Sequence, residues 1–118
     1  MRALLISLAA LGAFALAGPA AASAKGCGDM FREGLSPERI VASGTSCATA
    51  RAVASGVATP PGSPLHGCVV IRRSGLRLTD PCVQRRFRCR VTDRVGARDY
   101  GLRVRCRRGA RAVTFEVR

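Results

Sequence analysis

Three segments near the end of the chain alternate apolar and polar residues with a period of two. They cover residues 86–91, 102–107 and 113–117. Such alternation is typical of strands that turn one face to a core and the other to water. The connections between them are short, with Gly96 in the first and Arg108-Gly109 in the second, which favours antiparallel pairing. The pattern therefore predicts a three-stranded antiparallel meander with one apolar face.

That apolar face needs a cover, and residues 47–56 predict a short helix that can supply it. The inner face of the meander would carry Phe87, Cys89, Val91, Leu102, Val104, Cys106, Val113, Phe115 and Val117. Thr45 or Ser46 can cap the first turn of the helix, small apolar residues then recur at helical spacing, and Gly56 is placed just beyond its end. We expect an α+β fold in a single domain, residues 25–118, with one short helix packed on a small antiparallel sheet.

Cysteine content indicates that this domain is stapled by disulfides. The six cysteines are Cys27, Cys47, Cys68, Cys82, Cys89 and Cys106. An even number of cysteines in a short exported chain is typical of a disulfide framework. A zinc site is not expected, because no two cysteines are spaced C-x-x-C and His66 is the only histidine. We expect no metal and no cofactor.

One disulfide follows from local sequence and the other two do not. Cys68 and Cys82 bracket a predicted hairpin, and closing that loop stabilises the fold by about 3 kcal/mol through the entropy of the unfolded chain. For the remaining four cysteines we favour the pairs Cys47–Cys89 and Cys27–Cys106. The exchange of partners between these two pairs stays open.

Residues 1–24 have the pattern of a secretory signal peptide. A positive start at Arg2 precedes an apolar run over residues 3–17, and residues 22–24 fit the small-residue cleavage rule. The apolar run falls short of the ~20 residues that a spanning helix needs, and Lys25 lies too close to Cys27 for a lipoprotein cleavage site. We expect cleavage after Ala24, a secreted or extracellular protein, and no membrane span in the mature chain.

The net charge of +13 comes almost entirely from arginine. Six arginines are expected together on the outer face of the meander: Arg86, Arg88, Arg90, Arg103, Arg105 and Arg107. Like charges opposite one another destabilise a sheet, so the arrangement favours visiting anions, such as an envelope polymer or lipid headgroups. Specific nucleic-acid binding is not expected, because Phe87 and Phe115 point inward and leave no platform for bases. The alternative is a solvated surface that merely reflects an arginine-rich composition.

Catalytic motifs are weak. Residues 44–46 resemble the serine motif of subtilisin-like proteases, but in that family an aspartate motif and a histidine motif come before the serine. Here the sole histidine, His66, follows it, and the chain is too short for the doubly wound sheet that the triad requires. A nuclease would need a carboxylate beside a histidine, and nothing places Glu33, Glu38 or Glu116 next to His66. We do not expect an enzyme.

The layout of the chain resembles the small secreted cysteine-containing proteins of high-GC actinobacteria, which are largely uncharacterised. The shared pattern consists of residues 40–53, Phe87-Arg88-Cys89, Val104-Arg105-Cys106 and Val113-Thr114-Phe115. The resemblance implies export and a compact domain, and it transfers no catalytic residues. The segment between Cys68 and Cys82 departs from this layout.

Two functions are compatible with these features. The first is a secreted or envelope-associated, non-enzymatic binding or structural module with a basic, anion-attracting face. The alternative is a secreted protease inhibitor, which would present Arg72 and Arg73 at the tip of the bracketed hairpin to a trypsin-like pocket.

Overall fold

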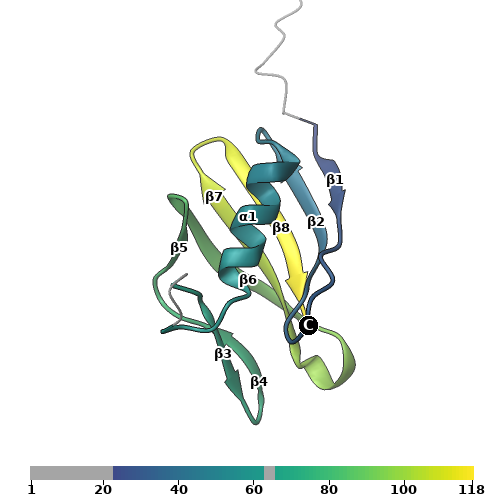
Figure 1. Ribbon diagram of the computed structural model, residues 1–118, viewed down its shortest axis with the longest axis vertical. Helices are drawn as coiled ribbons and strands as arrows, with labels where there is room; N and C mark the ends of the chain where they lie inside the picture. The colour runs from purple at the N-terminus through teal and green to yellow at the C-terminus, as the bar shows by residue number, and fades with distance from the viewer. Residues whose placement is uncertain (1–22, 63–65) are drawn as a thin grey trace, which may run out of the picture.

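The computed structural model describes residues 23–62 and 66–118, so all but the last two residues of the predicted leader lie outside the described residues. The elements in chain order (Figure 1) are β1 (Lys25–Gly28), β2 (Pro37–Ser43), α1 (Cys47–Val57), β3 (Val69–Arg72), β4 (Gly75–Leu78), β5 (Cys82–Gln84), β6 (Phe87–Val95), the 3₁₀ turn η1 (Ala97–Asp99), β7 (Gly101–Arg108) and β8 (Arg111–Val117).

The main part of the fold is one antiparallel sheet. Its strand order is β1-β2-β8-β7-β6-β5, and β3 and β4 form a separate two-stranded hairpin. The predicted meander is confirmed as β6-β7-β8, but β2 and β1 extend it on one side and β5 on the other. The prediction of an α+β fold with a small sheet is therefore corrected, because the sheet has more strands than expected. The fold is mostly antiparallel sheet, with one short helix and three disulfides among the described residues.

Helix α1 lies across one face of this sheet (Figure 1) and buries its apolar side against it. The buried helical residues are Ala50, Val53, Ala54 and Val57. Ser46 is the N-cap, and its Oγ accepts a hydrogen bond of 3.1 Å from the backbone N–H of Thr49. Of the two capping candidates, the structure therefore selects Ser46.

Gly56 lies inside the helix, and the prediction that it follows the helix end is wrong. The helix continues to Val57, and Ala58 is its C-cap. A Cβ at position 56 would collide with the side chain of Gln84 from β5. Gly56 therefore serves close packing between α1 and the edge strand, rather than a left-handed turn.

The core lies between α1 and the sheet. Most of the predicted inner face is buried, with Phe87, Leu102 and Phe115 each at most 1% exposed. Val91 is an exception at 38% exposed. It precedes a bulge in β6, where the pairing with β7 shifts between Val91 and Asp93. A bulge bends its strand and increases the local twist. The simple alternation of buried and exposed residues in β6 therefore breaks down at this point.

The disulfides are Cys27–Cys47, Cys68–Cys82 and Cys89–Cys106. The local pair Cys68–Cys82 is confirmed. The pairs Cys47–Cys89 and Cys27–Cys106 are wrong, and so is the exchanged pairing. Cys89 and Cys106 are direct partners in the ladder between β6 and β7. Strand β1 packs against α1 and brings Cys27 to the first residue of the helix.

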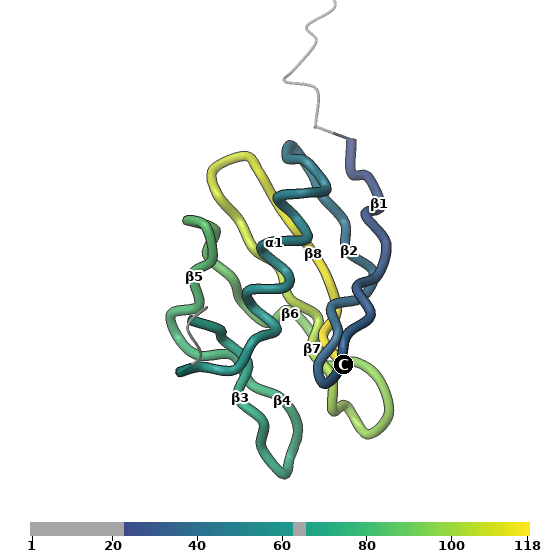
Figure 2. The backbone as a smooth tube through the Cα atoms, in the orientation of Figure 1, coloured from purple at the N-terminus to yellow at the C-terminus, as the bar shows by residue number. Residues whose placement is uncertain are grey.

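The hairpin β3–β4 extends from one end of the sheet, as the backbone trace in Figure 2 also shows. Its buried residues Val69 and Leu76 join the core. The backbone N–H of Leu76 donates to the carbonyl of Tyr100 at 3.1 Å, and Arg94 Nη1 donates to the carbonyl of Leu76 at 3.3 Å. The hairpin is thus held at its base by Cys68–Cys82, and beside its turn by the two bonds of Leu76.

Candidate functional site

The face of the sheet opposite α1, here called the outer face, is arranged in three cross-strand rows. Residues that are directly paired across strands point to the same face. The register gives an acidic row Asp93–Arg103–Glu116–Glu38, a second row Arg90–Arg105–Thr114–Val41 and a third row Arg88–Arg107–Ala112–Ser43. Carboxylates are therefore confined to one row, and the other two combine arginines with uncharged residues.

Glu116 is the centre of the acidic row. Its side chain is only 4% exposed, and it pairs with Arg118 at 2.8 Å, with Arg103 at 3.1 Å and with Arg39 at 3.8 Å. Burial opposes ionisation, but hydrogen bonds from Arg118 and Arg103 and the charges of the cluster hold the pKa of Glu116 below its ordinary value. The carboxylate therefore stays ionised and neutralises the arginines around it.

Two further ion pairs complete this row. Arg103 also pairs with Asp93 at 3.3 Å, and Arg118 pairs with Glu38 at 3.6 Å. Arg103 is thus shared between two carboxylates. Arg103 lies on the outer face with the other predicted arginines, but its charge is already compensated within the protein.

The second and third rows bring four of the predicted arginines together. Arg90 lies opposite Arg105, and Arg88 lies opposite Arg107. In the part of the chain that the structure describes, none of the four forms an ion pair. Together with Cys89 they line a hollow of about 240 Å³, here called the arginine hollow.

Arg105 differs from the other three arginines because it is half-buried. Its Nε–H is shielded from solvent and has no hydrogen-bond acceptor. A buried donor without an acceptor costs about 1–3 kcal/mol. The guanidinium therefore has bonding capacity that the folded protein itself does not use.

A second hollow of about 310 Å³ lies beside the first and shares Arg105 and Arg107 with it. Its other walls in the mature chain are uncharged: Val41, Ser43, Ala110, Ala112 and Thr114. Ala24 also borders it, but this residue belongs to the leader that we expect to be removed. We call this second hollow the neutral hollow. The outer face thus has a strongly positive depression beside one whose walls, apart from the shared Arg105 and Arg107, are uncharged.

The last of the six predicted arginines, Arg86, does not lie on the sheet face. Arg85 and Arg86 form the two-residue turn between β5 and β6, with φ of 48° and 66°. Positive φ at both positions matches the type I′ turn that suits a tight hairpin. The alternating pattern extends through Arg86 in the sequence, but the strand begins only at Phe87, so this part of the prediction is also corrected.

Sequence reasoning missed the acidic row and the neutral hollow. The alternation of the last segment already placed Glu116 on the outer face, so this carboxylate could have been recognised as a partner for Arg103. The walls of the neutral hollow could not have been predicted. Val41 and Ser43 belong to β2, and the pairing of β2 with β8 is not visible in local sequence.

The hairpin proposed for an inhibitor has exposed arginines at its tip. Arg72 is the last residue of β3 and pairs with Gly75, which leaves Arg73 and Ser74 as a two-residue turn. Both arginines are exposed. The tip is accessible, but its backbone is tightly bent rather than extended.

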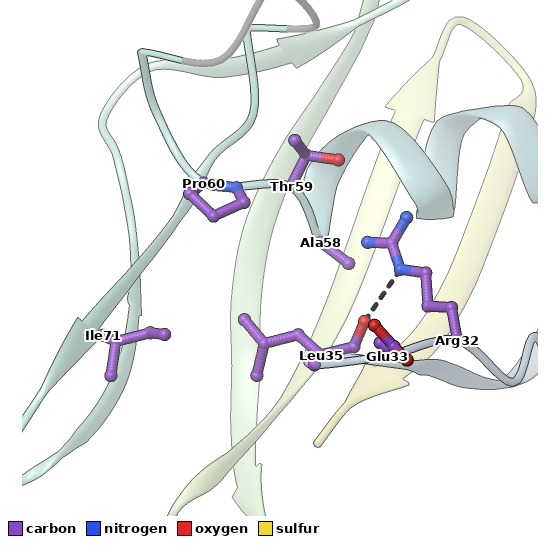
Figure 3. Close-up of a pocket in the computed structure, with 8 residues that line it drawn as sticks. Arg32, Glu33, Leu35, Ala58, Thr59, Pro60 and Ile71 are labelled. Atoms are coloured by element: carbon purple, nitrogen blue, oxygen red, sulfur yellow. Dashed lines mark hydrogen bonds between the residues drawn. The ribbon is translucent and has the colours of Figure 1, made fainter.

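An apolar pocket of about 410 Å³ lies between the loop after β1, the end of α1 and β3 (Figure 3). Leu35, Pro60 and Ile71 border it, and Arg32 turns its guanidinium to the carbonyl of Leu35 at 2.8 Å and to Ser55 Oγ at 2.9 Å. Because Arg32 is engaged in these bonds, the pocket offers mainly apolar surface.

Catalytic and metal-binding groups do not gather elsewhere in the described chain. No cluster of His, Cys, Asp or Glu among residues 23–62 and 66–118 could hold a metal ion. Ser46 is used as a helix cap, and Glu38 and Glu116 are held by arginines. Over the same residues, no helix has both the length and the apolar character needed to cross a membrane.

No protein-family model matches this chain, and no curated protein or solved structure is significantly similar to it.

Proposed function

We propose that this protein is a secreted or envelope-associated binding module, without catalytic activity, that holds anionic polymers on the outer face of its sheet. The observation that carries the proposal is the set of two directly opposed arginine pairs, Arg88/Arg107 and Arg90/Arg105, around one hollow with no carboxylate in their rows. Three disulfides support export, since such bonds persist in oxidising compartments. The predicted leader and the resemblance to exported actinobacterial proteins point the same way.

The energetics favour an anion at this place. Directly opposed like charges destabilise a sheet by roughly 0.2–1 kcal/mol a pair, and the acidic row shows that the same sheet can compensate arginines with carboxylates. An oxyanion that reaches the arginine hollow turns this repulsion into charge-assisted hydrogen bonds, which are about twice as strong as neutral ones. Ligand binding therefore relieves the electrostatic repulsion between paired arginines that destabilises the free protein.

Nucleic acid is a less suitable partner than an envelope polymer or a headgroup. Among the described residues the exposed aromatic side chains are Phe31 and Tyr100. Both lie in connections between strands, and neither belongs to a row of the outer face. Bases would therefore find no stacking platform beside the arginines.

Retention on a polyphosphate column tests the proposal. The double variant R105Q/R107Q should elute at clearly lower salt than the unchanged protein, because it loses two phosphate contacts. The matched control R77Q/R98Q removes the same charge from exposed positions elsewhere and should elute close to the unchanged protein. Equal shifts for both variants would show that net charge alone causes retention, as expected for a compositionally biased surface.

A protease inhibitor is the alternative, and it is favoured by the exposure of Arg72 and Arg73 on a hairpin closed by Cys68–Cys82. The two-residue turn weighs against it, because an inhibitory loop must lie extended in the cleft of the protease. Incubation with trypsin separates the two cases. Stoichiometric loss of trypsin activity with an intact hairpin supports the inhibitor function. Cleavage after either arginine without inhibition rules this function out.

A further inference from the structure

We propose that the two adjoining hollows form one site for a polyol phosphate, with the phosphate in the arginine hollow and the hydroxyl-bearing carbon chain in the neutral hollow. This inference rests on the proposed function, since it names the class of anion that the outer face holds. It applies equally to a phosphate carried by a soluble polymer and to one carried by a lipid headgroup.

The arginine hollow suits a tetrahedral oxyanion. One planar guanidinium fork already matches the two oxygens of a carboxylate. Four guanidiniums around about 240 Å³ offer far more donors than a carboxylate can accept. A phosphate group presents oxygens in several directions, so that arginines from β6 and from β7 can bond to it at once.

Arg105 links the two hollows. Its side chain lines both of them, and its Nε–H has no acceptor within the protein. A small movement of this side chain on binding would bring that donor to a phosphate oxygen. Arg105 is therefore expected to contribute more to phosphate binding than the more exposed Arg88 or Arg90.

The neutral hollow indicates what is attached to the phosphate. A polyphosphate would place its next charge in this depression, where the walls from β2, β7 and β8 are uncharged apart from the shared Arg105 and Arg107. A carbon chain with hydroxyl groups fits better, because Val41 and Ala112 offer apolar contact and the Thr114 hydroxyl can exchange hydrogen bonds. Charges separated by uncharged hydroxylated units are the defining feature of a polyol phosphate.

Titration calorimetry at fixed ionic strength tests this assignment with three soluble polymers of equal charge number: poly(glycerol phosphate), polyphosphate and polygalacturonate. We expect the tightest binding for poly(glycerol phosphate) and roughly tenfold weaker binding for polygalacturonate, in line with about 1.4 kcal/mol per factor of ten. Vesicles containing phosphatidylglycerol form a fourth arm. Binding to them with the same dependence on Arg105 identifies headgroups as a source, and binding to the soluble polymer alone identifies a polymer.

Two variants probe the hollows separately. R105K keeps the charge but loses the planar fork and the Nε–H donor, so affinity for both phosphate polymers should fall. A112L fills the neutral hollow and should reduce affinity for poly(glycerol phosphate) about tenfold, with polyphosphate binding unchanged. If A112L fails to fold, T114V removes the hydroxyl at constant shape and should reduce the same preference by a smaller factor.

The outcomes separate this inference from the proposed function. Equal affinity of the unchanged protein for all three polymers would overturn the polyol phosphate site and leave a general anion-binding face. A preference for poly(glycerol phosphate) that survives both A112L and T114V would also overturn it. Failure to bind any of the polymers or vesicles would overturn the proposed function itself.

Discussion

At the scale of single residues, Glu116 is the most consequential side chain of the outer face. E116Q keeps its shape but removes the charge that holds Arg39, Arg103 and Arg118. Hydrogen bonds to charged groups contribute about 1.5–3 kcal/mol, so we expect the free energy of unfolding to fall by about that amount in urea denaturation. E33Q changes an exposed carboxylate outside the ion pairs and should have little effect. Equal stability of E116Q and E33Q would show that the arginine cluster is not structural.

The pH dependence of stability provides a second prediction at this scale. The pKa of Glu116 is lowered in the folded protein from an ordinary value of 4.5, so the unfolded chain binds the proton more readily. The stabilisation is fully present above pH 4.5 and is lost as the pH falls through the lowered pKa. The difference in unfolding free energy between the unchanged protein and E116Q should therefore shrink below pH 4.5. A difference that stays constant to pH 3 would contradict this role.

At the scale of elements, the hairpin β3–β4 depends on its disulfide. Cys68 and Cys82 are 14 residues apart in sequence, and opening a loop of this size destabilises by about 3 kcal/mol in the chain-entropy model. For C68S/C82S we expect faster hydrogen exchange at the amides of β3 and β4, with the amides of β7 still protected. Loss of protection in β7 as well would show that the hairpin and the sheet unfold as one unit.

Elements whose pattern lies within one short stretch of sequence could be predicted. Elements that depend on pairing between distant segments could not. The meander was predictable because each of its strands carries its own alternation and the connections are short. Strand β5 was not predictable, because three residues are too few to show a period. The four residues of β1 allow an extended segment to be expected, but not its place in the sheet. The place of β2 beside β8 depends on pairing between distant segments, and a bulge between Glu38 and Val41 interrupts its register.

The same distinction applies to the disulfides and to the site. Cys68–Cys82 could be predicted because the two cysteines flank a hairpin that is visible in the sequence. Cys27–Cys47 could not, because it depends on where β1 lies in the fold. Arg88, Arg90, Arg105 and Arg107 were predicted correctly as neighbours because they belong to the meander. The ion pair between Arg103 and Glu116 depends on the register between β7 and β8. Arg86 lies in a turn, although the alternating pattern of the sequence continues through it.

At the scale of the whole molecule, the uncompensated arginines should make stability depend on salt and on ligand. R88T/R90T relieves both opposed pairs and should raise the free energy of unfolding by about 1 kcal/mol at low ionic strength. In 1 M salt the Debye length is only ~3 Å, so the gain should largely disappear. R72T/R77T removes the same charge from the hairpin and should leave stability nearly unchanged. Destabilisation by R88T/R90T at low salt would contradict repulsion at this face.

Added polyanion should act on the molecule in the opposite direction. A ligand that binds only the folded state stabilises it in proportion to the logarithm of its concentration above Kd. Polyphosphate should therefore raise Tm for the unchanged protein and raise it less for R88T/R90T. An equal rise for R88T/R90T and for R72T/R77T would indicate binding spread over the whole surface.

The central claim is that Arg88, Arg90, Arg105 and Arg107 form the anion site. The most direct measurement is an NMR titration of the ¹⁵N-labelled protein with polyphosphate that follows the Nε–H signals of the arginine side chains. We expect large shifts for these four arginines, with the largest for Arg105, whose Nε–H has no acceptor in the free protein. The ion-paired Arg103 should change little. Uniform shifts across all exposed arginines, or shifts confined to Arg72, Arg73 and Arg77, would contradict the claim.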